Sequence, residues 1–185
     1  MSSPPTSMDP HFYNLFSNIN VSEHVFDSLV KLDPDSRIIP GLAESWKLVN
    51  NLTWEFKIRK GVEFHDGKTL TADDVIYTMN RHLGKDSVSN ASSLVSMISE
   101  WKKVNDYEVK AILSSPNADL PIALGTFHFK ILQEGAEDFS TAIGTGPYKV
   151  KEFKPGVRTV GARFDNYWGE GGYLDEIEHF GIGDP

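Results

Sequence analysis

The sequence predicts an α/β fold of the mixed α+β kind, in which short strands are interleaved with a few helices. Segments of alternating apolar residues lie in both the first and the last third of the 185 residues, with helix-like segments between them. Hydrophobic residues make up 39% of the chain and aromatic residues 11%, which is enough to form a buried core. No apolar run approaches the roughly 20 residues that span a bilayer. We therefore expect a folded chain whose outer thirds supply strands around an insertion.

A first helix is expected after an irregular start. Residues 1–20 are rich in Pro, Ser and aromatic residues, a composition typical of a loop. Ser22 is a suitable N-cap for a short helix, and Asp33-Pro34-Asp35 is a suitable stop. The pattern therefore predicts a helix from Ser22 to about residue 30. Its apolar stripe consists of Val25, Phe26, Leu29 and Val30.

A strand with a period of two follows. Residues 42–46 lead toward a turn at Asn50-Asn51, and apolar residues then alternate with charged ones over 54–58. This alternation predicts a half-buried strand. Residues 62–64 continue the alternation, and a turn is expected at 65–68.

The clearest helix signal begins at Thr71, which is a suitable N-cap. Asp73 and Asp74 lie in the first turn, where the helix dipole favours anions, so we interpret them as capping residues rather than as a catalytic acid pair. Gly84 is expected to end the helix. The predicted buried stripe consists of Val75, Ile76, Met79 and Leu83.

The remaining elements are expected to be short. Residues 94–101 are compatible with a short helix, and a strand pair is expected to turn at Asn105-Asp106. Residues 118–124 look helical. A second set of strands is expected over 148–164, with a last strand within 174–182.

Charge and cysteine content exclude several classes of function. The net charge is −8 and no Lys/Arg run exceeds two residues, so we expect no nucleic-acid partner and no binding to an anionic membrane surface. The chain has no cysteine, which excludes disulfides, thiolate metal sites and a Cys nucleophile. Residues 1–5 (MSSPP) lack the features of a signal peptide.

Common signatures of catalysis are missing from the sequence. The six His residues are scattered and form no HExxH motif, and no GxSxG or GxxxxGK[ST] motif occurs. Gly144-Thr145-Gly146 resembles the start of a dinucleotide fingerprint, but Lys149 replaces its third glycine and a strand follows instead of a helix. No enzymatic activity and no cofactor are therefore expected.

One enzymatic alternative stays open. Glu63, His65 and Asp66 are close enough in sequence to ligate a metal in a small metal-dependent hydrolase, with His128 as a further candidate. The competing interpretation is that Asp66 and Gly67 form an ordinary turn.

The loop near the N-terminus combines the side chains that small-molecule pockets use. Phe12, Tyr13 and Phe16 supply apolar contact area, and the interleaved Asn14 and Asn18 supply adaptable hydrogen bonding. The alternative is that these rings only anchor the loop to the core.

Several segments, taken together in this order, resemble the family 5 extracellular solute-binding proteins, which include the peptide- and nickel-binding subunits of bacterial ABC importers. The segments span nearly the whole chain. They are residues 7–11 (SMDPH), 25–30 (VFDSLV), 40–46 (PGLAESW), 53–56 (TWEF), 59–67 (RKGVEFHDG), 71–75 (TADDV), 144–149 (GTGPYK) and 166–169 (NYWG).

The resemblance implies a lobe like those of periplasmic binding proteins, with a mixed sheet and an inserted smaller subdomain. Residues 1–43 and 143–185 correspond to the core of the main lobe and residues 44–142 to the insertion, while the second large lobe is absent from this chain. It further implies a protein that closes on its ligand by hinge motion and delivers it to a membrane permease. The implied location is the periplasm, with an export signal that this chain does not contain.

The resemblance also implies a ligand site, position by position. Tyr13, Asn14, Leu15 and Phe16 match a segment that runs alongside bound peptide in the relatives. Asn90, Ala91 and Ser92 match a second wall of the same cleft, and Phe127 and His128 are candidates for a third.

A small peptide is the expected ligand, with a metal chelate, a sugar or an opine-like compound as open alternatives. We expect the 185 residues alone to bind it weakly, because half of the cleft is missing. The exposed cleft face is also a candidate for self-association.

Overall fold

The computed structural model describes residues 7–12, 16–84, 87 and 89–180. Its helices are α1 (Phe16–Val25), α2 (Ala72–Asn80) and α3 (Leu120–Leu124), with a 3₁₀ turn, η1 (Ser92–Val95). Its strands are β1 (Val30–Leu32), β2 (Ile38–Pro40), β3 (Ala43–Asn50), β4 (Thr53–Ile58), β5 (Ile98–Asn105), β6 (Glu108–Leu113), β7 (Tyr148–Lys154), β8 (Arg158–Arg163) and β9 (Glu176–Phe180). This content of helices and strands confirms the predicted mixed α/β class.

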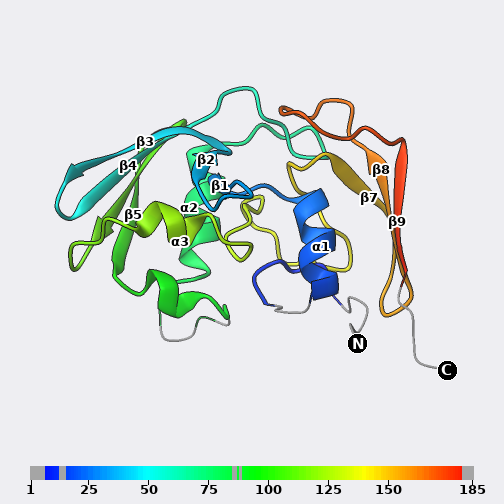
Figure 1. The fold of residues 1–185 in the computed structure, drawn as a ribbon, viewed down its shortest axis with the longest axis horizontal. Helices are drawn as coiled ribbons and strands as arrows, with labels where there is room; N and C mark the ends of the chain where they lie inside the picture. Colours follow the sequence, from blue (N-terminus) through cyan, green and yellow to red (C-terminus); the bar gives the residue numbers. More distant parts are fainter. Residues whose placement is uncertain (1–6, 13–15, 85–86, 88, 181–185) are drawn as a thin grey trace.

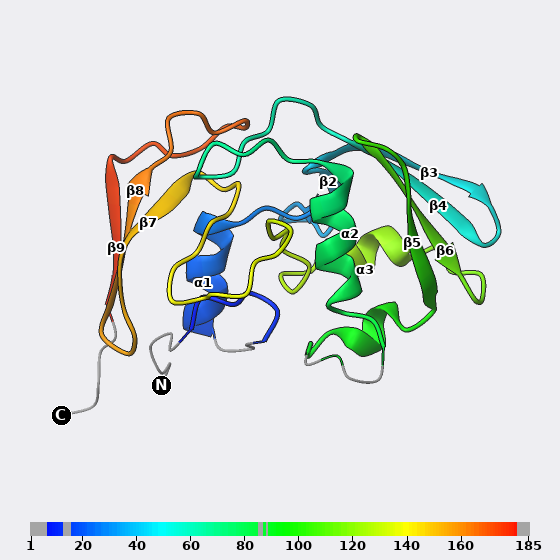
Figure 2. The same ribbon diagram turned by 180° about the vertical axis from the view of Figure 1, so that it is seen from behind.

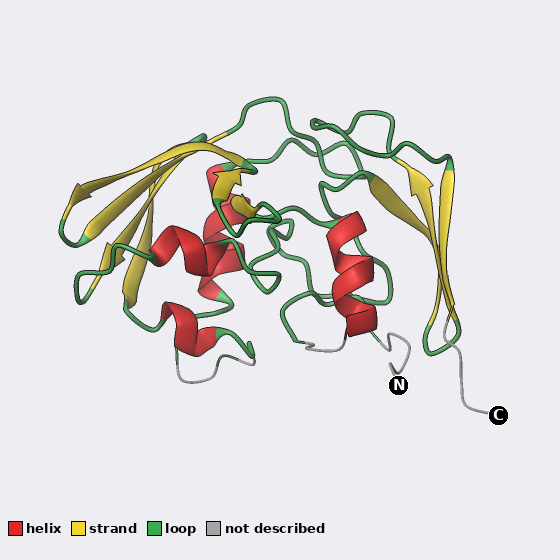
Figure 3. Ribbon diagram, viewed as in Figure 1, coloured by secondary structure: helices red, strands yellow, loops and turns green. Residues whose placement is uncertain are grey.

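Two larger sheets lie at opposite ends of the molecule (Figures 1 and 3). One has the strand order β3-β4-β6-β5 and the other the order β7-β8-β9, and all of these pairings are antiparallel. Helix α2 packs against β5 and β6, whereas α1 packs against β7 and β8. The view from behind shows α1 and α2 side by side between the two sheets (Figure 2).

The larger core forms where the alternation of β4 meets β6. Phe56 lies opposite Val109, and Trp54 lies opposite Ala111, with all four side chains buried. The ring of Trp101 from β5 packs 5.8 Å from the ring of Phe56. The period of two therefore predicted this strand and its buried face correctly.

Helix α2 begins as predicted but ends earlier. The N–H of Thr71 donates a hydrogen bond to Oδ2 of Asp74 (2.9 Å), which confirms the capping role of this carboxylate. The helix ends at Asn80 rather than at Gly84. The N–H groups of residues 81–83 bond to carbonyls three residues earlier, so the last turn tightens and departs from α-helical geometry.

Helix α1 begins at Phe16, so the predicted loop up to residue 20 and the predicted N-cap at Ser22 are wrong. Val30 is buried, in keeping with the apolar stripe, but it lies in an extended strand and pairs with Pro40. Neighbouring apolar residues suit a buried strand as well as a helix. Pairing with a distant segment decides between the two here.

The segment 94–101 is also extended in part, contrary to the prediction of a helix. It contains the end of η1 and the first half of β5. Ile98 lies opposite Leu113 and Trp101 opposite Ala111, so both apolar side chains reach the core from a strand.

A second, smaller core lies around α1. It consists of Met8, Val21, Val25, Phe26, Leu132 and Ala142. The division into a main lobe (residues 1–43 and 143–185) and an inserted subdomain (44–142) stays a prediction. In the described part of the chain, no helix is both long enough and apolar enough to cross a membrane.

Candidate ligand-binding site

The first predicted wall is only partly described. Tyr13, Asn14 and Leu15 lie outside the described residues, and Phe16 is described only as the first residue of α1. The residues directly before them are placed. Phe12 is 47% exposed, so the loop that leads into this wall presents an aromatic side chain at the surface.

The second predicted wall contacts the residue that leads into the first. The side-chain amide of Asn90 donates a hydrogen bond to the backbone carbonyl of Phe12, although the two residues are 78 positions apart. Asn90 itself is exposed, whereas Ala91 is buried. Ser92 begins η1 and is partly exposed. The structure thus places Asn90 against Phe12, directly before the first predicted wall.

The third predicted wall lies next to the same N-terminal loop. Phe127 lines a shallow depression with Asp9 and Pro10 and with residues of α1. The ring of His128 lies 3.9 Å from the ring of Phe127, and burial lowers the pKa of His128. Residues 9–12 therefore adjoin both the second and the third predicted wall.

A buried polar network holds this N-terminal loop. Nη2 of Arg81 pairs with Oδ2 of Asp9 (2.6 Å), and Nη1 of Arg81 donates to Nδ1 of His11 (3.0 Å). Nε2–H of His11 donates to the carbonyl of Lys130 (2.7 Å). Burial lowers the pKa of His11 to about 3, so the ring is neutral and can accept from Arg81 while donating to Lys130.

His82, which follows Arg81 just after helix α2, supports the loop of the second predicted wall. Nδ1 of His82 bonds to Oγ of Ser89 (2.6 Å), and this hydroxyl oxygen also accepts the N–H of Ala91 (3.1 Å). The ring of His82 lies 4.3 Å from that of His11 and 4.7 Å from that of Phe129. Burial lowers the pKa of His82 to about 2. The sequence analysis missed Arg81, His82 and Ser89. Arg81 pairs with Asp9 across 72 positions and His82 with Ser89 across seven positions beyond the end of α2, so neither pairing leaves a periodic signal.

The hydrolase alternative is not supported. His65 uses both ring nitrogens on backbone groups: Nε2–H donates to the carbonyl of Gly146 (2.9 Å), and Nδ1 accepts the N–H of Gly144 (3.3 Å). Glu63 accepts a hydrogen bond from Asn166.

Asp66, the third residue of the candidate metal site, also bonds to other groups of the protein. Asp66 accepts the N–H of Lys68 (3.1 Å) and the side-chain amide of Gln133 (3.0 Å). Across residues 7–12, 16–84, 87 and 89–180, no group of three or more His, Asp or Glu residues is placed to hold a metal ion. The hydrogen bonds of Glu63, His65 and Asp66 thus connect separate parts of the fold.

Gly144 and Gly146 are required by close packing rather than by phosphate binding. A Cβ atom on Gly144 would lie 2.0 Å from the carbonyl oxygen of Val25, and one on Gly146 would lie 2.6 Å from that of His24. Such contacts leave no room for any side chain.

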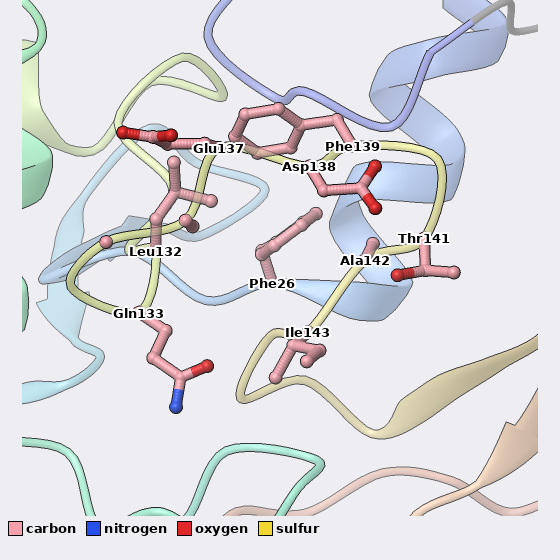
Figure 4. Close-up of a pocket in the computed structure, with 11 residues that line it drawn as sticks. Phe26, Leu132, Gln133, Glu137, Asp138, Phe139, Thr141, Ala142 and Ile143 are labelled. Carbon is pink, nitrogen blue, oxygen red and sulfur yellow. The ribbon is translucent and has the colours of Figure 1, made fainter.

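A separate cavity of about 290 Å³ lies under the loop 132–143 (Figure 4). Phe26, Leu132, Phe139 and Ile143 supply apolar lining, and Glu137 and Asp138 lie at its edge. The sequence analysis did not predict it, and Asn90, Ala91, Ser92, Phe127 and His128, the predicted site residues whose side chains are described, do not line it.

Comparisons with known proteins bear on what such a site binds. The sequence profile described as "Bacterial extracellular solute-binding proteins, family 5 Middle" matches residues 37–185. The oligopeptide-binding protein AppA of Bacillus subtilis is 33% identical over 188 residues, covering 95% of this chain and 35% of AppA.

Solved structures agree with the sequence match. AppA in complex with a nonapeptide superposes with a TM-score of 0.88 and 30% identity, covering 98% of this chain and 39% of AppA. NikA from Brucella suis in complex with Fe(III)-EDTA superposes with a TM-score of 0.88 and 27% identity, covering all of this chain and 39% of NikA. The chain thus spans little more than a third of the length of these relatives.

Proteins of this family are substrate-binding proteins of ABC transporters rather than enzymes, and they act in the periplasm or outside the cell. The profile matches most of the chain, and the match to AppA covers nearly all of it. This chain belongs to the bacterial extracellular solute-binding proteins, family 5.

Proposed function

We propose that this chain forms one side of the solute site of an ABC-type importer, and that the solute is a small peptide. The observation that supports the proposal is that the second and the third predicted wall both adjoin residues 9–12. Asn90 bonds to the carbonyl of Phe12, and Phe127 lies beside Asp9 and Pro10. Segments far apart in sequence thereby lie next to the loop that leads into the first predicted wall.

A peptide suits such a surface because an extended ligand presents regular N–H and C=O groups, which loop backbones can bind whatever its side chains are. The similarity to the oligopeptide-binding protein AppA supports this class of solute. The structure of NikA with Fe(III)-EDTA keeps a metal chelate as the second candidate.

The proposal assigns binding and no catalysis to this site, and it needs no cofactor. The proposed ligand-contacting residues are Tyr13, Asn14, Leu15, Phe16, Asn90, Ala91, Ser92, Phe127 and His128. The proposed location is the periplasm after export, and the proposed partner is the membrane permease of the importer. Ala91 is buried, so its part in the wall is through its backbone.

An NMR titration of the 185-residue chain tests the class of solute. Di-, tri- and pentapeptides, a ferric chelate and an opine are added separately while the backbone amide signals are followed. Peptides are expected to shift the amides of Phe12, Asn90 and Phe127 with weak affinity, because this chain contributes only one side of the proposed site. Larger shifts with the chelate or the opine, or no shift with any peptide up to its solubility limit, would contradict the assignment to peptides.

We also propose that the exposed cleft face of this chain self-associates. Phe12, beside the proposed site, is 47% exposed, which supports this proposal. Light scattering after size exclusion at increasing concentration is expected to show a rising mass. A constant monomer mass over that range would count against self-association.

A further inference from the structure

The C-terminal end of α2 contacts both loops that border the proposed site. Arg81 and His82 are consecutive residues just after the helix, and their side chains reach different loops. We define the N-terminal loop as residues 9–12 and the second loop as residues 89–92. The inference drawn from these two contacts rests on the solute-binding function proposed above.

The contact to the N-terminal loop is charged and largely buried. The side chains of Arg81 and Asp9 are 21% and 13% exposed, and the guanidinium also donates to His11. The central guanidinium carbon of Arg81 lies 4.9 Å from the ring centroid of Phe139. The carboxylate of Asp9 in turn accepts the backbone N–H of His11 (3.0 Å). Arg81 therefore fixes both the side chains and the backbone of this loop.

The contact to the second loop is neutral and fully buried. His82 is 1% exposed and holds the hydroxyl of Ser89, which accepts the N–H of Ala91. The carbonyl of Arg81 also accepts the hydroxyl of Ser87 (2.7 Å). The backbone of the second loop is thus held by side chains that the same helix end positions.

A third contact joins the two loops directly. We call the three contacts, which connect the end of α2 with both loops and the loops with each other, the circuit. Asn90 of the second loop donates to the carbonyl of Phe12 in the N-terminal loop. Both loops are thus attached to the end of α2 and to each other.

We propose that Arg81 and His82 are positioning residues that set the separation of the two loops bordering the solute site. The side chain of His82 is buried beneath the loops, and Arg81 is turned toward Asp9 and His11, so they act through the residues that meet the solute. The loops move as one unit as long as the circuit is intact.

Amide hydrogen exchange followed by NMR tests this circuit without any solute. Two amides report on the two loops: the N–H of His11, bonded to Asp9, and the N–H of Ala91, bonded to Ser89. The variant Arg81→Met removes the charge and keeps most of the side-chain volume. It is expected to raise the exchange rate of both amides by about tenfold, since a hydrogen bond to a charged group is lost. Arg163→Met, which removes an exposed ion-paired arginine of β8, is the matched control and is expected to change neither.

Asn90→Ala separates coupling from a local effect. In the Asn90→Ala background, Arg81→Met is expected to accelerate the exchange of His11 alone. Acceleration confined to His11 with Asn90 still present would overturn the proposal. If Arg81→Met also lowers the protection of amides in β4 and β6, the same exchange measurement is made on the milder variant Ser89→Ala. Unchanged exchange of the His11 amide in Ser89→Ala would then overturn the proposal.

A solute titration separates this proposal from the proposed function. Where the wild-type chain shows peptide-induced shifts at Asn90, Arg81→Met is expected to weaken the apparent affinity by about tenfold at unchanged protection of β4 and β6. Coupled exchange without any peptide shift in the wild type would contradict the proposed function but not the circuit. If Arg81→Met accelerates amide exchange in both loops but leaves the affinity for the peptide unchanged, the positioning role is contradicted.

Discussion

Nε1–H of Trp168 donates a hydrogen bond to Oδ2 of Asp27 (2.9 Å), across 141 positions of the chain. The same buried carboxylate pairs with Nζ of Lys31 (2.6 Å) and accepts a hydrogen bond from Oγ1 of Thr145 (3.3 Å). Three of the segments that resemble family 5, residues 25–30, 144–149 and 166–169, therefore meet at one side chain. Their role is to build the junction between α1 and the three-stranded sheet.

Asp27→Asn is expected to lower the free energy of unfolding by about 2 to 3 kcal/mol, because it leaves a partly buried Lys31 without its counter-charge. Urea unfolding measures the loss. Asp165→Asn is the matched control, since Asp165 is 82% exposed in its ion pair, and its expected effect is about 0.5 kcal/mol or less. Equal losses in the two variants would contradict the role given to Asp27.

Gly144→Ala is expected to destabilise the chain by about 2 kcal/mol or more, because its Cβ would collide with the backbone of Val25. At Gly169 the nearest atoms to an added Cβ belong to the side chain of Tyr167, at 3.2 Å, which can move aside. Thermal unfolding of the two alanine variants compares them. A Gly144→Ala variant as stable as Gly169→Ala would show that the backbone approach is not tight.

Acid is expected to destabilise the chain steeply below about pH 6. The pKa values of His11 and His82 fall from 6.5 to about 3 and about 2 through burial, so the unfolded chain takes up protons that the folded chain does not. Stability is therefore fully present above pH 6.5 and is lost as the pH falls toward 3. Each of the two residues contributes a slope of about 1.4 kcal/mol per pH unit in that range.

Urea unfolding between pH 7 and pH 4 measures this slope. His82→Gln is expected to reduce it by about one proton, because Gln does not titrate. A slope that is the same in the variant and in the wild type would contradict the buried, neutral state of His82.

His65→Ala is expected to lower the free energy of unfolding by about 2 kcal/mol, since it leaves the carbonyl of Gly146 and the N–H of Gly144 without their partner. Addition of EDTA or of zinc is expected to leave the melting temperature of the wild type unchanged. A melting temperature that rises with zinc and falls with EDTA in the wild type, but not in His65→Ala, would revive the metal-dependent alternative.

The sequence predicted the elements whose signals are local. The alternation of Trp54, Phe56 and Ile58 identified β4, and Thr71 with Asp74 identified the start of α2. Both depend on residues at most four positions apart. The start of α1 was missed because its first residues carry no regular apolar stripe.

Residue types pointed only to the N-terminal loop around Tyr13, Asn14 and Phe16, and the rest of the candidate site was predicted from the resemblance. Residues 13–16, 90–92 and 127–128 were named from matched segments, and the contact between Asn90 and Phe12 followed only from the fold. Arg81 and Asp9 are 72 positions apart, and no spacing rule connects them. Such pairings depend on how the loops pack around the end of α2.

Photo-crosslinking with a short peptide that carries a benzophenone side chain tests whether a peptide binds at the three predicted walls. The crosslinked residues of the 185-residue chain are then located by mass spectrometry. The account predicts crosslinks within residues 9–16, 89–92 and 126–128, and their loss when unlabelled peptide is added in excess. Competed crosslinks concentrated at the cavity under residues 132–143 instead would contradict it.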